Sequence, residues 1–361
     1  MRRRRFLTQA GAGVGGVALL AGCSAAPADK GQTTGTPNGP PRGTLTVATY
    51  SSFTGDGAAG TWLKSAFEKE YPKVTVKFET PENGFNQYIQ RQQQGAPLGA
   101  DMYVGLNTGE LVRADQKLDD DILRSFDGIE GRDAVKEGLR IDPNGRAVPY
   151  DTGYISLVYD EDEVQNPGTF DALLDSRYEG ALITENAQQS DTGRAFLLWT
   201  ILAKGNDGYL DYWSSLLDNG ARVLSDWEPA YQAYTNGEAP MVVSYSTDQV
   251  YYHGPDVNMA KHQVGFLDDQ GYANPEAMGV FADAKNPRLG RLFMEFVLTE
   301  RAQEKIAVKN VQFPAVEGVT PGEEFSKYAL EPPEPVTFSY DDLAGNVETW
   351  VDDWARLVAS H

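Results

Sequence analysis

The sequence predicts an α/β protein made of two doubly wound domains. Strand-like and helix-like segments alternate along the chain with loops of a few residues between them, which is typical of an open parallel sheet covered by helices. About 318 of the 361 residues follow a Pro/Gly-rich segment, enough for roughly two domains of about 150 residues each. Two long extended segments, 148–160 and 275–284, bracket the middle block, as expected where a chain leaves one domain and later returns to it.

The first domain begins with a strand at 44–50, where apolar and β-branched residues alternate. A helix follows, with apolar residues at helical spacing from Trp62, and Pro72 closes it. Asn107 and Glu110, three residues apart, form a capping pair that predicts the start of a further helix. Between these features we expect a strand at 74–78, a helix at 85–94 and a strand at 100–106.

The middle block keeps the alternation of strands and helices. After it, Asn286 and Pro287 open an amphipathic helix, and a last helix carries Val347, Trp350 and Trp354 on one face. The elements expected within the block are a strand at 181–184, helices at 192–204, 208–217 and 229–234, and a strand at 241–245. We therefore assign residues 44–150 and 277–361 to the first domain and residues 151–276 to the second.

The N-terminus has the pattern of an export signal. Arg2–Arg5 precede a Gly/Ala-rich apolar stretch that is shorter than the roughly 20 residues a membrane span needs. Residues 3–7 (RRRFL) resemble the twin-arginine export pattern, and residues 20–23 (LAGC) resemble a lipobox. We expect residues 1–22 to be removed and Cys23 to be lipidated, which would attach the protein to the outer face of the cytoplasmic membrane.

Residues 23–43 are expected to form a flexible tether behind that lipid anchor. From Ser24 to Gly43 the segment has four Pro and four Gly and no large apolar side chain, so it cannot contribute to a core. As a flexible coil, its 20 residues would reach on the order of 25 Å.

The charge of the chain excludes several classes of partner. It has 31 Lys+Arg against 52 Asp+Glu, a net charge of −21, and loss of Arg2–Arg5 would leave −25. Such an acidic protein lacks the basic face that binding to nucleic acid or anionic lipid requires. Because 41% of residues are hydrophobic and 11% aromatic, the acidity does not indicate disorder. We hypothesise a surface adapted to high salt, where the Debye length is only about 3 Å near 1 M.

The sequence contains no recognisable catalytic or metal-binding motif. Cys23 is the only cysteine, which excludes an internal disulfide and a Cys-based zinc site. The three histidines, His253, His262 and His361, match no helical ligand pair. The chain also lacks a P-loop, a GxGxxG turn after a strand, HExxH and GxSxG. We therefore expect a protein that is not an enzyme and holds neither a cofactor nor a metal.

Aromatic residues at the ends of predicted elements indicate a cleft instead. Tyr50 ends the first strand, Trp227 lies in a polar turn at a helix start, and Tyr245 ends another strand. Tyr and Trp faces attract cations by about 0.5–2 kcal/mol each. Ser190 and Asp191 precede a helix, where they fit either a helix cap or a site for a polar ligand group. The residue types alone leave both interpretations open.

Five segments of the chain resemble the thiamine-binding proteins of ABC importers, in the same order and across nearly the whole folded part. The resemblance implies a type II periplasmic-binding-protein fold, with two lobes joined by two hinge strands. It also implies a monomer that captures thiamine or its phosphates between the lobes and delivers them to a membrane permease and its ATPase. The segments are 44–53 (TLTVATYSSF), 100–106 (ADMYVGL), 148–160 (VPYDTGYISLVYD), 190–199 (SDTGRAFLLW) and 227–251.

The resemblance also implies which residues contact the ligand. Trp227 would form the main aromatic wall, with Asp191 or Asp248 as a counter-charge to the thiazolium ring. Three positions depart from the family pattern: Asn83 and Ser51 stand where acidic residues are typical, and Val311 where the bacterial pattern has a tryptophan. The full set of implied contacts is Tyr50, Asn83, Gly84, Ser190, Asp191, Trp227, Tyr245, Ser246, Thr247, Asp248, Gln249 and Tyr251.

Three alternatives remain open at this level. The adjacent tyrosines Tyr251 and Tyr252 are similar to those of ferric-ion receptors of the same fold. A polyamine receptor would also use acidic and aromatic side chains. A lipid-anchored hydrolase is the remaining alternative, although no activated nucleophile is visible in the sequence.

Overall fold

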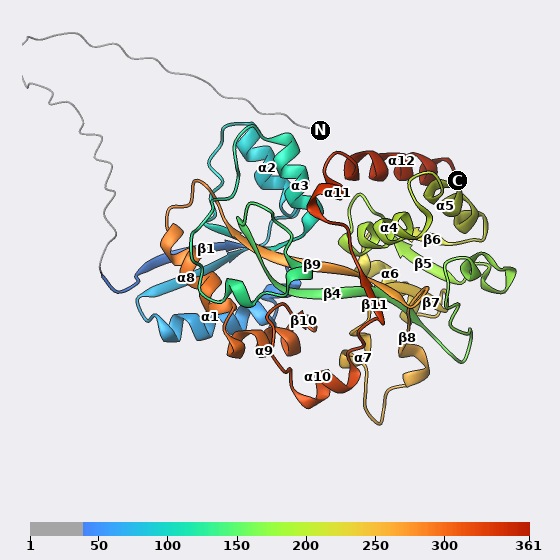
Figure 1. Ribbon diagram of the computed structural model, residues 1–361. Helices are drawn as coiled ribbons and strands as arrows, with labels where there is room; N and C mark the ends of the chain where they lie inside the picture. The colour runs from blue at the N-terminus through green and yellow to red at the C-terminus, as the bar shows by residue number, and fades with distance from the viewer. Residues whose placement is uncertain (1–38) are drawn as a thin grey trace, which may run out of the picture. The chain divides into compact units, whose positions relative to one another are not determined.

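The computed structural model describes residues 39–361, and its main feature is one continuous mixed sheet (Figure 1). The strand order is β2-β1-β3-β9-β4-β7-β5-β6, with β8, β10 and β11 paired at its sides. The predicted signal peptide 1–22, the lipid anchor Cys23 and most of the tether lie outside the described residues. The strands are β1 Gly43–Ala48, β2 Val74–Glu79, β3 Met102–Leu106, β4 Ala147–Tyr159, β5 Leu182–Glu185, β6 Arg222–Leu224, β7 Met241–Tyr245, β8 Gln263–Gly265, β9 Gln270–Val280, β10 Phe313–Pro314 and β11 Glu334–Val336.

Each end of the sheet is parallel, and an antiparallel pair joins the two ends. Strands β2, β1 and β3 pair in parallel, as do β7, β5 and β6. Between them β4 and β9 run antiparallel to each other and to their neighbours β7 and β3. The helices are α1 Ala59–Glu70, α2 Asn86–Gln93, α3 Thr108–Lys117, α4 Asp191–Lys204, α5 Tyr209–Asp218, α6 Trp227–Thr235, α7 Asp248–Tyr251, α8 Pro287–Val297, α9 Glu300–Lys309, α10 Glu323–Tyr328, α11 Tyr340–Leu343 and α12 Val347–Ser360.

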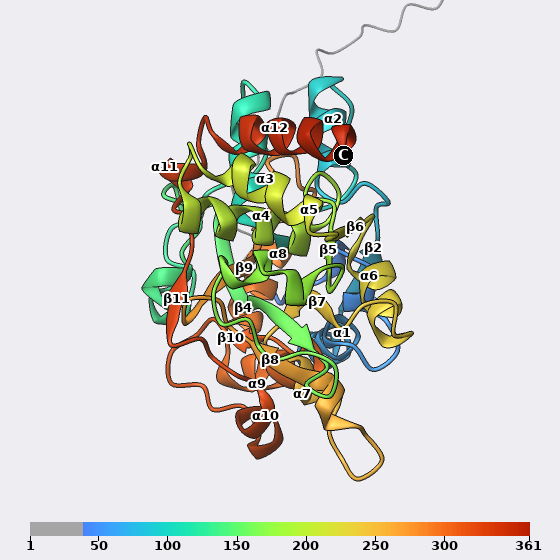
Figure 2. The same ribbon diagram turned by 90° about the vertical axis from the view of Figure 1, so that its right-hand side faces the viewer.

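Helices cover both faces of each half of the sheet, as expected for a doubly wound arrangement. In the first half, α1, α8 and α9 pack on one face and α2 and α3 on the other. In the second half, α4 and α5 lie on one face and α6 on the other (Figures 1 and 2). The capping pair is confirmed at the start of α3, where Asn107 and Glu110 form a complete capping box. Helix α9 has no counterpart among the predicted elements.

The two extended segments noted in the sequence are β4 and β9, which cross the middle of the molecule side by side (Figure 1). Val148 and Met278 belong to the core of the first half, whereas Ile155 and Tyr272 belong to the core of the second. Each strand therefore contributes to both cores, and Pro41–His361 form one compact unit. The strands occupy the position that hinge strands require.

The last helix differs from its expected place. The sequence assigned residues up to 361 to the first domain, but α12 packs on the second half of the sheet. Trp354 meets Trp213 of α5 edge to face at 5.4 Å between ring centroids, and Trp350 joins the same core. The apolar face of α12 was correctly recognised, but an amphipathic stripe does not specify which core it covers.

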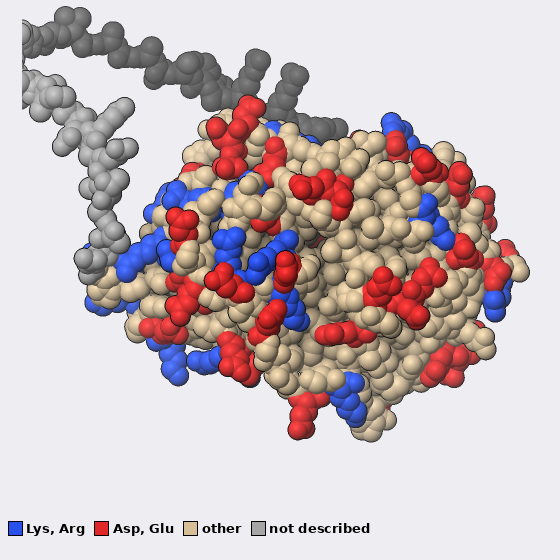
Figure 3. Space-filling model, viewed as in Figure 1, with Lys and Arg blue, Asp and Glu red and all other residues tan. Residues whose placement is uncertain are grey.

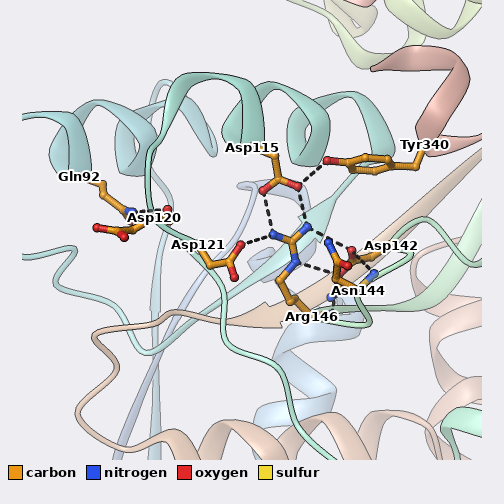
Figure 4. Close-up of polar contacts among 9 residues, drawn as sticks. Gln92, Asp115, Asp120, Asp121, Asp142, Asn144, Arg146 and Tyr340 are labelled. Carbon is orange, nitrogen blue, oxygen red and sulfur yellow. Dashed lines mark hydrogen bonds and ion pairs between the residues drawn. The ribbon is translucent and has the colours of Figure 1, made fainter. Parts of the chain in front are cut away.

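A buried arginine fixes the turn that leads into β4 (Figure 4). We call Arg146 with Asp115, Asp121, Asp142 and Tyr340 the Arg146 cluster. The guanidinium forms a fork with Asp115, at 2.9 and 2.6 Å, and also contacts Asp121 at 2.6 Å and Asp142 at 3.1 Å. Tyr340 donates to Asp115 at 2.6 Å. Because Arg146 is only 2% exposed, these contacts replace the water it lost on folding.

Acidic side chains lie over the whole visible face of the folded part, whereas Lys and Arg are sparser on the half that holds β5 to β7 (Figure 3). Within residues 39–361, no helix is both long and apolar enough to cross a membrane.

Candidate ligand-binding cleft

A cleft of about 1350 Å³ lies between the two halves of the sheet. Its walls come from loops that follow strands: Tyr50 after β1, Asn83 after β2, Ser190 after β5 and Trp227 after β6. Ligands of open α/β sheets bind at these carboxyl ends, where backbone and side chains are free of the ladder. The topology therefore brings segments distant in sequence to one opening.

Ten of the twelve residues that the sequence analysis implied as ligand contacts line this cleft. The exceptions are Ser246, which is fully buried, and Gln249, whose amide donates to the carbonyl of His262 at 2.8 Å. The residues that line it are Tyr50, Asn83, Gly84, Ser190, Asp191, Trp227, Tyr245, Thr247, Asp248 and Tyr251.

After Tyr251, Trp227 is the most exposed large aromatic residue of the cleft lining. It is the first residue of α6, and its backbone N–H donates to the capping Asp226 at 2.8 Å. The indole is 37% exposed, donates to Ser244 Oγ at 3.0 Å and stacks on Tyr231 at 5.1 Å. One hydrogen bond and one stacking contact thus fix the ring while leaving part of it open to the cleft.

Behind Trp227 the aromatic rings continue into the second half. Tyr231 stacks on Tyr252 at 5.8 Å, and Tyr252 stacks on His262 at 4.2 Å. Both Tyr231 and His262 bind Asp248, at 2.5 and 2.8 Å. Asp248 lines the cleft as expected, but its two oxygens already have partners in the chain. The Asp248 carboxylate therefore links Tyr231 and His262 and is not a free counter-charge.

The sequence left open whether the turn before α4 is a helix cap or part of a ligand site, and the structure shows how Ser190 and Asp191 lie there. Ser190 Oγ accepts from the N–H of Gly193 at 3.4 Å, so Ser190 is the helix cap, and it also lines the cleft. Asp191 accepts from Asn107 of the opposite half at 3.0 Å. Burial and the charge of Asp191 raise the pKa of the neighbouring Glu110 to about 8.

The deepest acidic groups were missed by the sequence analysis. Asp151 on β4 and Glu276 on β9 are register partners across the two central strands. Tyr50 and Tyr150 donate to one oxygen of Glu276 at 2.8 and 2.5 Å, and Asn310 donates to Asp151 at 2.8 Å. We call these five residues the cleft floor. A signal was present, because carboxylates inside two segments predicted as central strands are unusual there.

Burial dominates the electrostatics of the cleft floor. It raises the pKa of both carboxyl groups, and the charge of Glu276 raises the pKa of Asp151 further. Opposing these effects, the Tyr50, Tyr150 and Asn310 hydrogen bonds favour the ionised forms.

Val311 stands where the bacterial family pattern has a tryptophan. It lies at the cleft with φ of 53°, a left-handed conformation that β-branched residues rarely adopt. Its side chain is 4% exposed and packs in a small core with Tyr154, Phe313 and Phe325. It therefore presents little surface to a ligand.

Acidic residues outnumber basic residues in the cleft lining, six to four. Of its basic residues, Arg113 pairs with Glu348 at 2.7 Å, Lys309 donates to the carbonyl of Gly57 and Arg194 to that of Ala187. The carboxylates that line it are Glu82, Glu110, Asp191, Asp226, Asp248 and Glu276. This arrangement favours a cationic ligand. Within the described part of the chain, no group of three His, Cys, Asp or Glu residues is placed to hold a metal ion.

Comparison with known proteins agrees with this architecture. The sequence profile of the family described as bacterial extracellular solute-binding protein matches residues 62–333. The thiamine-binding periplasmic protein of Escherichia coli (strain K12) is 27% identical over 320 residues, which cover 87% of this chain and 93% of that protein. The iron uptake protein A1 of Synechocystis is 23% identical over 69% of this chain and 72% of that protein.

A solved structure described as a periplasmic thiamin binding protein superposes on this chain with a TM-score of 0.76 at 27% identity. The superposition covers 88% of this chain and 98% of that one. The predicted two-lobed fold is thereby confirmed.

Proposed function

Because the chain belongs to the bacterial extracellular solute-binding protein family, we propose that its cleft captures thiamine or a thiamine phosphate for an ABC importer. The observation that carries this proposal is the pairing of a partly open Trp227 with a ring of carboxylates in one cleft. A thiazolium ring is flat and permanently cationic, so it can stack on an indole while nearby carboxylates stabilise its charge.

The remaining parts of the ligand have complementary groups in the cleft. Ser190 and Thr247 are hydroxyl-bearing residues of the lining that can bind the hydroxyethyl tail. Tyr50 and Tyr245 provide further aromatic surface on either side of the central strands. The relatives described as thiamine-binding periplasmic proteins support this ligand class.

The mechanism we propose involves no covalent step. The lobes formed around residues 44–150 and 151–276 close on the ligand by bending at β4 and β9, and then open to release it to the permease and its ATPase. Asn107 and Asp191 already join the two halves at 3.0 Å beside the cleft. We propose that the protein works as a monomer.

We further propose that the protein acts outside the cytoplasmic membrane. The twin-arginine pattern of residues 1–22 would direct export, and a lipidated Cys23 would hold the protein at the membrane surface. Acylation of Cys23 would appear in the intact mass of the membrane-extracted protein. A mature chain that begins elsewhere, or carries an unmodified Cys23, would contradict this part of the proposal.

Receptors for ferric iron and polyamines, and a hydrolase, are the alternatives to exclude. Tyr251 is 62% exposed, whereas Tyr252 is held between Tyr231 and His262, so the two do not form a matched pair of metal ligands. A thermal-shift panel with thiamine, its mono- and diphosphate, spermidine and ferric citrate tests the ligand class. We expect stabilisation only by the thiamine compounds. A shift with spermidine or iron alone, or turnover of a thiamine phosphate, would contradict the proposal.

A further inference from the structure

The cleft floor is a buried acidic site without a cation. Within residues 39–361, no Lys or Arg forms an ion pair with Asp151 or Glu276. Asp151 is fully buried, and its Oδ1 has no hydrogen-bond partner. Glu276 is partly exposed and lines the cleft. A carboxylate pair with one fully buried member is costly unless a proton or a donor compensates it.

None of the titratable groups described around Asp151 and Glu276 supplies a positive charge to balance the pair. The tyrosines are neutral and donate hydrogen bonds to Glu276, and the nearby carboxylate of Asp191 adds negative charge. Burial and the charge of Glu276 raise the pKa of Tyr50, Tyr103, Tyr150 and Tyr245. The groups that face the pair are Tyr50 after β1, Tyr103 on β3, Tyr150 on β4, Tyr245 on β7, Asp191 on α4 and Asn310 after α9.

The shape of the floor keeps Glu276 accessible from the cleft. Two glycines allow aromatic rings to lie against the backbone beside it. A Cβ at Gly105 would come within 2.6 Å of the Tyr50 ring, and one at Gly153 within 2.4 Å of the Tyr245 ring. Close packing on these glycines fixes the positions of both rings.

The floor is also connected to the aromatic wall. Ser244 and Tyr245 are consecutive on β7: Ser244 accepts from the Trp227 indole at 3.0 Å, and Tyr245 lies over Gly153 beside the floor. Trp227, Tyr50 and Glu276 line the same cleft of about 1350 Å³. A ligand with two linked rings can therefore contact Trp227 with one ring and the cleft floor with the other.

We infer that Glu276 is a specificity-determining residue, whose carboxylate accepts a hydrogen bond from an amino group on the second ring of the ligand. Asp151, held by Asn310, keeps the remaining proton of the pair. The inference rests on the proposed function and assigns the aminopyrimidine ring of thiamine to the floor and its thiazolium ring to Trp227. A site built to accept from an amino group discriminates against an analogue that lacks it, because the buried acceptor is then left unpaired.

Calorimetric titration with thiamine and oxythiamine tests this assignment. Oxythiamine carries an oxo group in place of the ring amino group, and the rest of the molecule is unchanged. We expect the wild-type protein to prefer thiamine by at least about tenfold. In Glu276→Gln the preference is expected to fall to within about threefold, because the amide can donate to the oxo group. Glu161→Gln removes one charge from an exposed position outside the cleft and should keep the wild-type preference.

The outcomes separate the inference from the proposed function. Equal affinity of the wild-type protein for both compounds, or a full preference retained by Glu276→Gln, would overturn the role of Glu276 while thiamine binding itself stands. Absence of thiamine binding by the wild-type protein would overturn the proposed function and this assignment with it. If Glu276→Gln fails to fold, Asp151→Asn provides the test: a neutral amide replaces the carboxyl group that keeps the proton, so this variant should retain the wild-type preference for thiamine. A preference that falls to within about threefold in Asp151→Asn would overturn the inference.

Discussion

Two groups of acidic side chains lie near the start of β4, and they differ in what balances their charge. In the Arg146 cluster, three aspartates surround a guanidinium that the chain itself supplies (Figure 4). Five residues further along, Asp151 faces Glu276 at the cleft floor, and only neutral donors bind the pair. The first group is balanced by a cation of the chain, and among residues 39–361 no Lys or Arg balances the second.

The comparison shows that the surroundings of a carboxylate decide its role in a chain with many acidic residues. A carboxylate that pairs with a cation of the same chain stabilises local structure, here the turn that leads into β4. A carboxylate pair that lines a cleft and has no such cation can interact with a ligand. Counting acidic residues in the sequence could not separate the two roles, because Asp pairs are frequent throughout the chain.

Removing the cation from the Arg146 cluster should have the largest effect. Arg146→Met leaves buried Asp142 and partly buried Asp115 without their charge partner, which costs about 3–5 kcal/mol of unfolding free energy. Chemical denaturation measures the loss. Arg222→Met, which removes an exposed pair with Glu238 at 2.8 Å, is the matched control and should cost less than about 1 kcal/mol. Equal losses in the two variants would refute the contrast.

Removing the aromatic wall should affect binding but not folding. Trp227→Ala is expected to weaken thiamine binding at least about tenfold, or about 1.4 kcal/mol, because the stacking surface for the cation is lost. Trp227→Phe keeps an aromatic face and should lose less. Calorimetry gives the affinities, and thermal unfolding checks that the fold is intact. Unchanged affinity in Trp227→Ala would remove Trp227 from the site.

The pH dependence of binding should report the ionisation of Glu110 in the cleft lining. The pKa of Glu110 is raised to about 8 by burial and by the charge of Asp191, so Glu110 gains its negative charge as pH rises through that value. Affinity for cationic thiamine should therefore increase, by about two- to fivefold between pH 7 and 8.5, since one more carboxylate attracts the cation. Glu110→Gln can keep the capping box of α3 and should flatten this rise. A decrease in affinity with pH would contradict the account.

Salt should have the smallest effect. We hypothesise that the spread of surface acids is adapted to high ionic strength, where their mutual repulsion is screened. Transfer from dilute buffer to molar KCl should raise the unfolding midpoint of the protein by ~2–4 °C. Arg146→Met should show the same increment, because the cluster is buried and its contacts are screened little. Equal stability in both buffers would contradict the hypothesis.

The sequence was most informative where local signals decide structure. The capping pair at Asn107 and Glu110, the strand at β1 and the helix opened by Pro287 were predicted correctly. Trp227 and Tyr50 were recognised at element ends because such positions are decided by neighbours in sequence. These features require no knowledge of which strands pair.

Features that depend on long-range pairing were not predictable in this way. Asp151 and Glu276 become partners only through the register of β4 with β9, 125 residues apart in sequence. Arg146 is separated from Asp115 and Tyr340 by whole elements, and the core that α12 covers depends on its meeting Trp213. Gln249 does not line the cleft, and its side chain binds the carbonyl of His262, a contact that the sequence could not indicate.

The most direct test of the account is calorimetric titration of thiamine into the purified wild-type protein near pH 7.5. The account predicts saturable binding of one thiamine per chain in the acidic, aromatic cleft, with a dissociation constant in the micromolar range or tighter, about −8 kcal/mol or more favourable. No heat and no thermal stabilisation at millimolar thiamine would contradict it.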